Sequence, residues 1–238
     1  MRKLFYSILL AAASLPSSAE TIVWVEGSEI LYDGELTEEA NRAVFDLYSQ
    51  QSTKPATLTI TSPGGPIHVG LELGEWVHEH RLNVKVYDLC FSSCANYVFP
   101  AGRKKLLGKG AVVGFHGGPT SETFDTSAIT AALRDVPEEQ RERLREDIEA
   151  SFSSYIQMNT QRESAFYKML GVSPKLNTLG QSEQYEELRE GYDGWVYTPE
   201  AMRIMGLSNL EIVDDPRPAK LAHKPKVFLL KLPPPTRL

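Results

Sequence analysis

Strand-like and helix-like segments alternate along the first half of the chain, and this alternation most constrains the fold. Residues 57–61 alternate in the manner of a strand, and apolar residues at helical spacing follow them from Val69 to Val77. Further strand-like runs occupy residues 82–87 and 111–115. A strand, helix, strand order is typical of parallel strands joined by crossover helices, so we predict an α/β fold.

The flanking segments extend this pattern. Residues 22–25 and 30–32 predict a hairpin, and Thr37 precedes a segment with helical spacing. Residues 195–197 return to strand character, and Thr198 is a candidate N-cap for the helix that follows.

Residues 120–190 are expected to form a helical insertion with a short helix, 127–133, and a long helix, 137–170. Pro137 and the glutamates that follow it suit a helix N-terminus. An apolar stripe runs along the long helix, and it packs either on the protein's own core or on a second subunit of a homo-oligomer. Its members are Leu144, Ile148, Phe152, Tyr155 and Ile156.

The two ends of the chain differ from its centre. Residues 1–19 combine a basic start, an apolar run too short to span a bilayer, and small residues before a cleavage point after Ala19. We interpret them as a signal peptide of a secreted or periplasmic protein; an uncut N-terminal anchor is the alternative. One globular domain is then expected over residues 20–215, followed by a proline-rich basic tail, 216–238, in which residues 227–230 could dock as a strand.

Charge and cysteine content narrow the function. The net charge of −6 lacks the basic footprint of a nucleic-acid-binding protein. Cys90 and Cys94 are the only cysteines, too few for a structural zinc site, and we expect no metal and no cofactor. Because an exported protein can hold a disulfide, we predict a local bridge between them across one helical turn.

Three short motifs carry residues suited to acyl transfer. A Ser-Pro-Gly-Gly turn ending at Gly65 follows a strand, and glycine there can present its backbone N–H to an oxyanion. Ser93 stands where a helix would begin, although serine is also a common N-cap. His116 directly follows a predicted buried strand and precedes two glycines, a position that favours a general base at the edge of a site. His68, close to Gly65 in the sequence, is the second candidate base.

The order of these motifs resembles the proteolytic subunit of the Clp protease, within the Clp/crotonase superfamily, over residues 21–213. The matching segments are Thr61 to Gly65, Ser92 to Gly102, Val113 to His116, Asp193 to Ala201 and Gly206-Leu207. The resemblance implies stacked ββα repeats with a long handle-like helix. It also implies a Ser93, His116 and Asp193 triad, with Gly65 and Cys94 forming the oxyanion hole. Asp193 is preferred to Asp88 and Asp125 because the residues after it stand at the family's spacing.

The resemblance predicts a serine peptidase that takes a peptide or protein substrate and has no stable membrane span. Export separates the chain from cytoplasmic ATP, so we expect no ATPase partner. The leading alternative is a non-catalytic exported scaffold or binding protein. Acyl-CoA chemistry of the crotonase type and a dithiol redox role are weaker alternatives, because coenzyme A is scarce outside the cytoplasm and no thioredoxin-like site is present.

Overall fold

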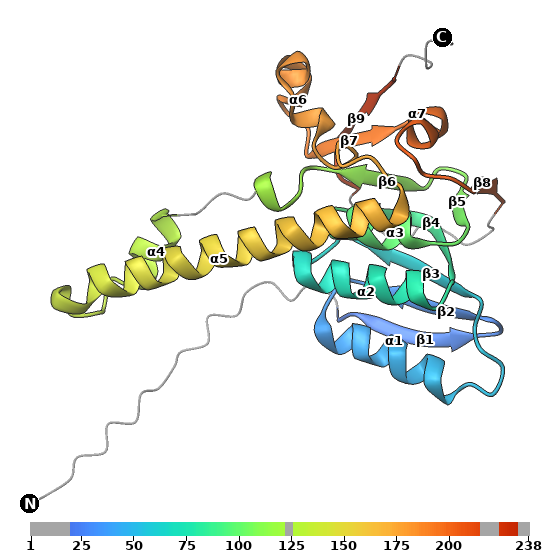
Figure 1. The fold of residues 1–238 in the computed structure, drawn as a ribbon, viewed down its shortest axis with the longest axis horizontal. Coiled ribbons are helices and arrows are strands. Elements are labelled where there is room, and N and C mark those ends of the chain that lie inside the picture. Colours follow the sequence, from blue (N-terminus) through green and yellow to red (C-terminus); the bar gives the residue numbers. More distant parts are fainter. Residues whose placement is uncertain (1–19, 122–125, 215–223, 233–238) are drawn as a thin grey trace, which may run out of the picture.

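The computed structural model describes residues 20–121, 126–214 and 224–232. The expected signal peptide, Asp125 and most of the expected tail lie outside the described residues. The described chain is a mixed α/β structure built on one nine-stranded sheet, which confirms the predicted class (Figure 1).

The sheet is mixed, with strand order β1-β2-β3-β4-β6-β7-β9 and a branch in which β5 joins β4 to β8. The β1–β2 hairpin is antiparallel as predicted, the pairs β2–β3, β3–β4 and β4–β6 are parallel, and β6–β7 is antiparallel. The strands span Ile22–Glu26 (β1), Glu29–Asp33 (β2), Thr57–Ser62 (β3), Asn83–Phe91 (β4), Lys105–Gly108 (β5), Val112–Phe115 (β6), Gly194–Tyr197 (β7), Leu210–Val213 (β8) and Val227–Leu230 (β9).

Strand β4 is longer than its sequence pattern predicts and has two neighbours on the same side. Its first half pairs with β5, where Val84 lies opposite Lys105, and its second half pairs with β6, where Cys90 lies opposite Val113. The extension carries the chain to Phe91, at the edge of the sheet where β3 and β6 also end. Three parallel strands therefore deliver their C-terminal ends to one place.

The helices between the strands pack side by side along the sheet (Figure 1). Helix α1 (Glu38–Gln50) begins at the Thr37 N-cap, whose hydroxyl accepts the Ala40 N–H. Helix α2 (Ile67–Glu79) contacts α1, the π-helix η1 (Cys94–Val98) and the short α3 (Phe99–Ala101). Gly70 and Gly74 let α2 approach η1, because a Cβ at either position would lie within 3 Å of Ser93 or Tyr97 atoms.

The predicted long helix is present as α5 (Glu138–Leu170), with the predicted short helix as α4 (Thr126–Ala132). The C-terminal half of α5 packs on the body, while its N-terminal half extends away from it together with α4 (Figure 1). Leu144 and Ile148 of the predicted stripe are 38% and 37% exposed, so that part of the stripe lies outside the core. The remaining helical elements are η2 (Pro119–Ser121), η3 (Leu179–Gln181), η4 (Glu183–Tyr185), α6 (Glu186–Arg189) and α7 (Pro199–Ile204).

The hydrophobic core lies between the sheet and these helices and is formed by fully buried aliphatic and aromatic side chains. Each such side chain contributes roughly 1.5–3 kcal/mol by leaving water. Trp195 of β7 is 1% exposed and contacts Phe228 of β9, so the predicted tail strand is part of the sheet. Over the described ranges, no helix combines the length and apolar character that crossing a membrane requires.

Candidate active site

The three sequence motifs meet where β3, β4 and β6 end. Ser62 at the end of β3 lies opposite Cys90 in β4, and Phe91 at the end of β4 lies opposite Gly114 in β6. The Pro-Gly-Gly turn, the two serines and His116 each come directly after one of these strands. Parallel pairing of adjacent strands therefore explains why segments distant in sequence form one site.

The chain makes a strained turn at Ser92, between β4 and η1. Ser92 has φ +56°, a left-handed conformation that a serine seldom adopts and that costs roughly 1–3 kcal/mol. The turn is held from both sides, because the Ser92 N–H donates to Gly114 O at 3.0 Å and its carbonyl accepts the Asn96 N–H at 2.8 Å. Ser92 is half-buried, so part of the residue is open to solvent.

His116 is paired with Ser92. Its Nε2 lies 2.7 Å from Ser92 Oγ, and its exposed ring stacks on Phe91 with centroids 5.4 Å apart. For the hydroxyl to donate to Nε2, the imidazole carries its proton on Nδ1. The backbone of this segment is fixed by amide side chains, since Gln181 Nε2 donates to His116 O at 3.0 Å and Asn96 Nδ2 to Gly117 O at 2.7 Å. A serine with a histidine acceptor at this distance has the geometry of an activated nucleophile.

Ser93, the serine favoured by the sequence, has a different partner. Its Oγ donates to Gly65 O at 2.8 Å, and the residue is only 3% exposed. The reason is the turn at Ser92, which sends the two neighbouring side chains in different directions. The structure thus brings His116 to Ser92 and uses Ser93 to tie the start of η1 to the glycine turn.

The glycine turn lies directly against this strained turn. Gly64 has φ +104°, and a Cβ there would lie 2.6 Å from Ser92 Cβ and 3.1 Å from Ser93 N. The Gly64 N–H donates to Ser62 Oγ at 3.1 Å. Among the described residues, neither the Gly65 N–H nor the Ser93 N–H donates a hydrogen bond. These two donors belong to the two segments that meet at the Ser92 turn, and both can donate a hydrogen bond to an anionic oxygen.

The sequence predicts an oxyanion hole formed by Gly65 and Cys94, with Cys94 directly after Ser93. Gly65 lies in the glycine turn, and its carbonyl accepts the Ser93 hydroxyl. The serine that His116 contacts is Ser92, and the residue directly after it is Ser93. Cys94 instead is fully buried as the first residue of η1.

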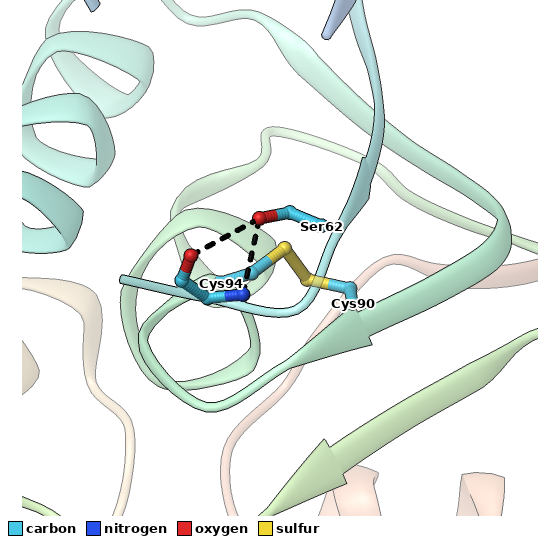
Figure 2. Close-up of a disulfide and its surroundings, with 4 residues drawn as sticks. Ser62, Cys90 and Cys94 are labelled. Atoms are coloured by element: carbon cyan, nitrogen blue, oxygen red, sulfur yellow. Dashed lines mark hydrogen bonds between the residues drawn. A yellow bond between two sulfur atoms is a disulfide. The ribbon is translucent and has the colours of Figure 1, made fainter. Parts of the chain in front are cut away.

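Cys90 and Cys94 form a disulfide, with their Cα atoms 5.2 Å apart (Figure 2). The predicted pair is therefore present, although the predicted location within one helical turn is wrong. Cys90 belongs to β4, because that strand continues to Phe91, so the bridge joins a strand to a helix across the Ser92 turn. Both cysteines are 0% exposed, and the bridge fixes the two arms of the turn.

Asp193, the expected third member of the triad, lies just before β7. It lines a cavity of about 130 Å³ together with His116, Gln181 and Tyr192. Its Oδ2 accepts the Lys226 N–H at 2.8 Å, and its own N–H donates to Lys226 O at 2.8 Å. Asp193 is thus on the same cavity as His116 and is held there by the segment that leads into β9.

The other candidates lie elsewhere. Asp88 is fully buried in β4 and forms an ion pair with Lys224. His68 contacts Tyr155 Oη and Glu38 Oε1, each at 3.3 Å, so the reserve base sits between α1 and α5. Asp125 falls outside the described residues. In the part of the chain that the structure describes, no three His, Cys, Asp or Glu side chains lie close enough to hold a metal ion.

A buried polar network behind the site was not expected from the sequence. Glu163 Oε1 on α5 accepts the Tyr97 hydroxyl at 2.7 Å and Asn177 Nδ2 at 2.6 Å. Burial raises the pKa of the Glu163 carboxyl and the pKa of the Tyr97 hydroxyl. The network joins α5 to η1, the helix that begins beside Ser92. Because its members are far apart in sequence and have no shared pattern, only the folded chain reveals it.

Comparison with protein-family models gives no match to this chain, and comparison with curated proteins gives no significant match. The site's chemistry therefore rests on its own geometry.

Proposed function

We propose that this protein is an exported serine hydrolase that cleaves peptide bonds, with Ser92 as nucleophile and His116 as general base. The observation that carries the proposal is the 2.7 Å contact between His116 Nε2 and Ser92 Oγ at a residue held at φ +56°. Strained backbone persists where the surroundings impose it, and such positions cluster at active sites. Here the disulfide, the Ser92 backbone bonds and Gly64 all act on the same turn.

The chemistry follows from the positions of the groups. Ser92 Oγ attacks the substrate carbonyl carbon while His116 Nε2 takes the hydroxyl proton. The negative oxygen of the tetrahedral intermediate accepts hydrogen bonds from the Gly65 and Ser93 N–H groups. When the carbon–nitrogen bond breaks, His116 returns the proton to the leaving amine and an acyl group remains on Ser92. Water, deprotonated by His116, then releases the acid and restores the serine.

Asp193 is the proposed orienting acid. Its place on the same cavity as His116 suits a carboxylate that stabilises the imidazolium formed during each step. Lys226 fixes one of its oxygens, which limits how the carboxylate can rotate.

The proposed fold family is the Clp/crotonase superfamily. Parallel strands with crossover helices, a glycine turn beside the nucleophile and a long helix α5 support this assignment. The buried disulfide suits an oxidising compartment outside the cytoplasm, where no ATPase partner would be available.

A fluorophosphonate probe, which reacts with activated serines, tests the proposal. Wild type should be labelled on Ser92, Ser92→Ala and His116→Ala should lose labelling, and Ser93→Ala should retain a labelled Ser92. Ser93→Ala is the matched control because it removes the neighbouring hydroxyl while leaving the His116 contact in place. Equal labelling of wild type and Ser92→Ala would refute the assignment, and a wild type that is never labelled would favour the non-catalytic scaffold.

A further inference from the structure

A second cavity lies away from the Ser92 turn, at the start of β5. Its volume is about 320 Å³, and its wall is formed by the ends of α2, α3 and α5 and the segment before β8. Lys105, the first residue of β5, lines it between β4 and β8. We call it the Lys105 cavity.

Lys105 is an unusual residue to find in this position. It is only 6% exposed, and within the described ranges burial is the one influence on its pKa, with no hydrogen-bond acceptor or charged partner contributing. Lysine is seldom so buried unless it is paired. Burial lowers the pKa of the Lys105 amine to about 8, so it still carries its charge at neutral pH for most of the time. An anion bound next to this ammonium would therefore gain an ion pair that the protein itself does not supply.

The rest of the wall is basic on one side and apolar on the other. Arg81, Arg103 and His78 line the cavity, and no acidic residue does. Arg103 Nε donates to Asn83 Oδ1 at 3.3 Å, which holds the guanidinium in place. Met169 and Leu170 from the end of α5 supply the apolar side. The nearby acid Glu211 pairs with Lys104 at 2.9 Å.

We propose that the Lys105 cavity binds a small organic anion whose carboxylate meets Lys105 and Arg103 and whose short apolar body lies against Met169 and Leu170. A carboxylate accepts hydrogen bonds from an ammonium and a guanidinium at once, which neutral groups do not match in strength. Two sources share this chemistry, a short fatty acid and the C-terminal residue of a peptide. The inference is independent of the proposed hydrolase activity, because it uses none of the residues at the Ser92 turn.

Calorimetric titration of the whole protein tests the proposal with four probes: hexanoate, N-acetyl-leucine, inorganic phosphate and the neutral hexanamide, each up to about 10 mM. We expect one or both carboxylates to bind and hexanamide not to bind. If hexanoate binds more tightly than N-acetyl-leucine, the natural ligand is a short fatty acid. If N-acetyl-leucine binds more tightly, the ligand is the C-terminal residue of a peptide. No carboxylate binding, or phosphate binding tighter than either carboxylate, would overturn the proposal.

Two substitutions locate the binding. Lys105→Met keeps the side-chain length and removes the charge, and it should weaken carboxylate binding by roughly tenfold or more. Lys104→Met is the matched control, since Lys104 is adjacent, pairs with Glu211 and does not line the cavity. It should leave affinity within about twofold. Equal affinity in wild type and Lys105→Met would exclude the site.

Folding of the Lys105→Met protein is checked separately by thermal unfolding. Because a charge that burial disfavours is removed, the midpoint should be at or above that of wild type. If that variant unfolds, Arg103→Gln removes the other proposed carboxylate partner, and it should also weaken binding roughly tenfold. Unchanged carboxylate affinity in Arg103→Gln would then overturn the proposal.

Discussion

Gly64 and Ser92 are packed so closely that a Cβ on the glycine would lie 2.6 Å from the Cβ of the serine. The two residues come from loops after different strands, and both have positive φ, +104° for Gly64 and +56° for Ser92. The absence of a side chain at one position therefore permits the strained conformation at the other.

Gly64→Ala should consequently damage both stability and the proposed site. The added methyl group meets Ser92 Cβ and Phe91 O, and alanine resists φ +104°, so we expect the free energy of unfolding to fall by roughly 2–5 kcal/mol. Gly110→Ala is the control: Gly110 has φ +79° but nothing within 4 Å of its Cβ position, so it should cost only about 1 kcal/mol. Chemical denaturation measures both, and equal losses would show that the close contact is unimportant.

The disulfide should stabilise the protein modestly and the Ser92 turn specifically. Cys90 and Cys94 stand only four positions apart in the sequence, and closing so short a loop contributes about 2 kcal/mol. The double variant Cys90→Ala/Cys94→Ala should lose that much by chemical denaturation, and fluorophosphonate labelling of Ser92 should slow.

Wild type refolded in dithiothreitol lacks the disulfide but keeps both cysteine side chains, so its rate of fluorophosphonate labelling can be compared with that of the oxidised protein. Labelling as fast as in the oxidised protein would mean that the bridge does not hold the turn.

The sequence predicts well those features that depend on local pattern. The hairpin of β1 and β2, the helix beginning at Thr37 and the N-cap at Thr198 have short-range signals, and the structure confirms them. The sequence did not predict strand β5, because the strand is short and begins with Lys105. Lysine is a residue type expected on the surface, although here it is buried.

The choice between Ser92 and Ser93 is a different problem. Residue types cannot decide between two adjacent serines, because the decision depends on which hydroxyl the turn directs toward His116. The positive φ at Ser92, which separates the directions of the two hydroxyls, is a property of the folded backbone.

Asp193→Asn tests the orienting acid. The asparagine amide oxygen can still accept the Lys226 N–H, so the segment before β9 should stay in place and stability should change by less than about 1 kcal/mol. Loss of the negative charge from the cavity that Asp193 shares with His116 should nevertheless lower kcat/KM for p-nitrophenyl acetate by roughly 10³–10⁴.

Asp46→Asn, an exposed aspartate of α1, controls for the general effect of removing one charge. Full activity in Asp193→Asn would assign the orienting role to another group.

Glu163 should make the stability of the protein depend on pH. Burial raises the pKa of this carboxyl above its ordinary value of 4.5, so the folded protein binds the proton more tightly than the unfolded chain does. The stabilisation that the protonated form contributes is complete below pH 4.5 and is lost as the pH rises through the raised pKa. Glu163→Gln has no titrating group, yet its amide oxygen can still accept the Tyr97 and Asn177 bonds.

The variant should therefore be as stable as wild type or more stable at pH 8, and this advantage should shrink as the pH falls toward 4. Chemical denaturation of both proteins at a series of pH values gives the difference directly. Glu146→Gln, at an exposed position of the same helix, should show no such trend and serves as the matched control. An advantage for Glu163→Gln that grew toward low pH would mean that the folded state favours the charged carboxylate, with the two hydrogen bonds outweighing its burial.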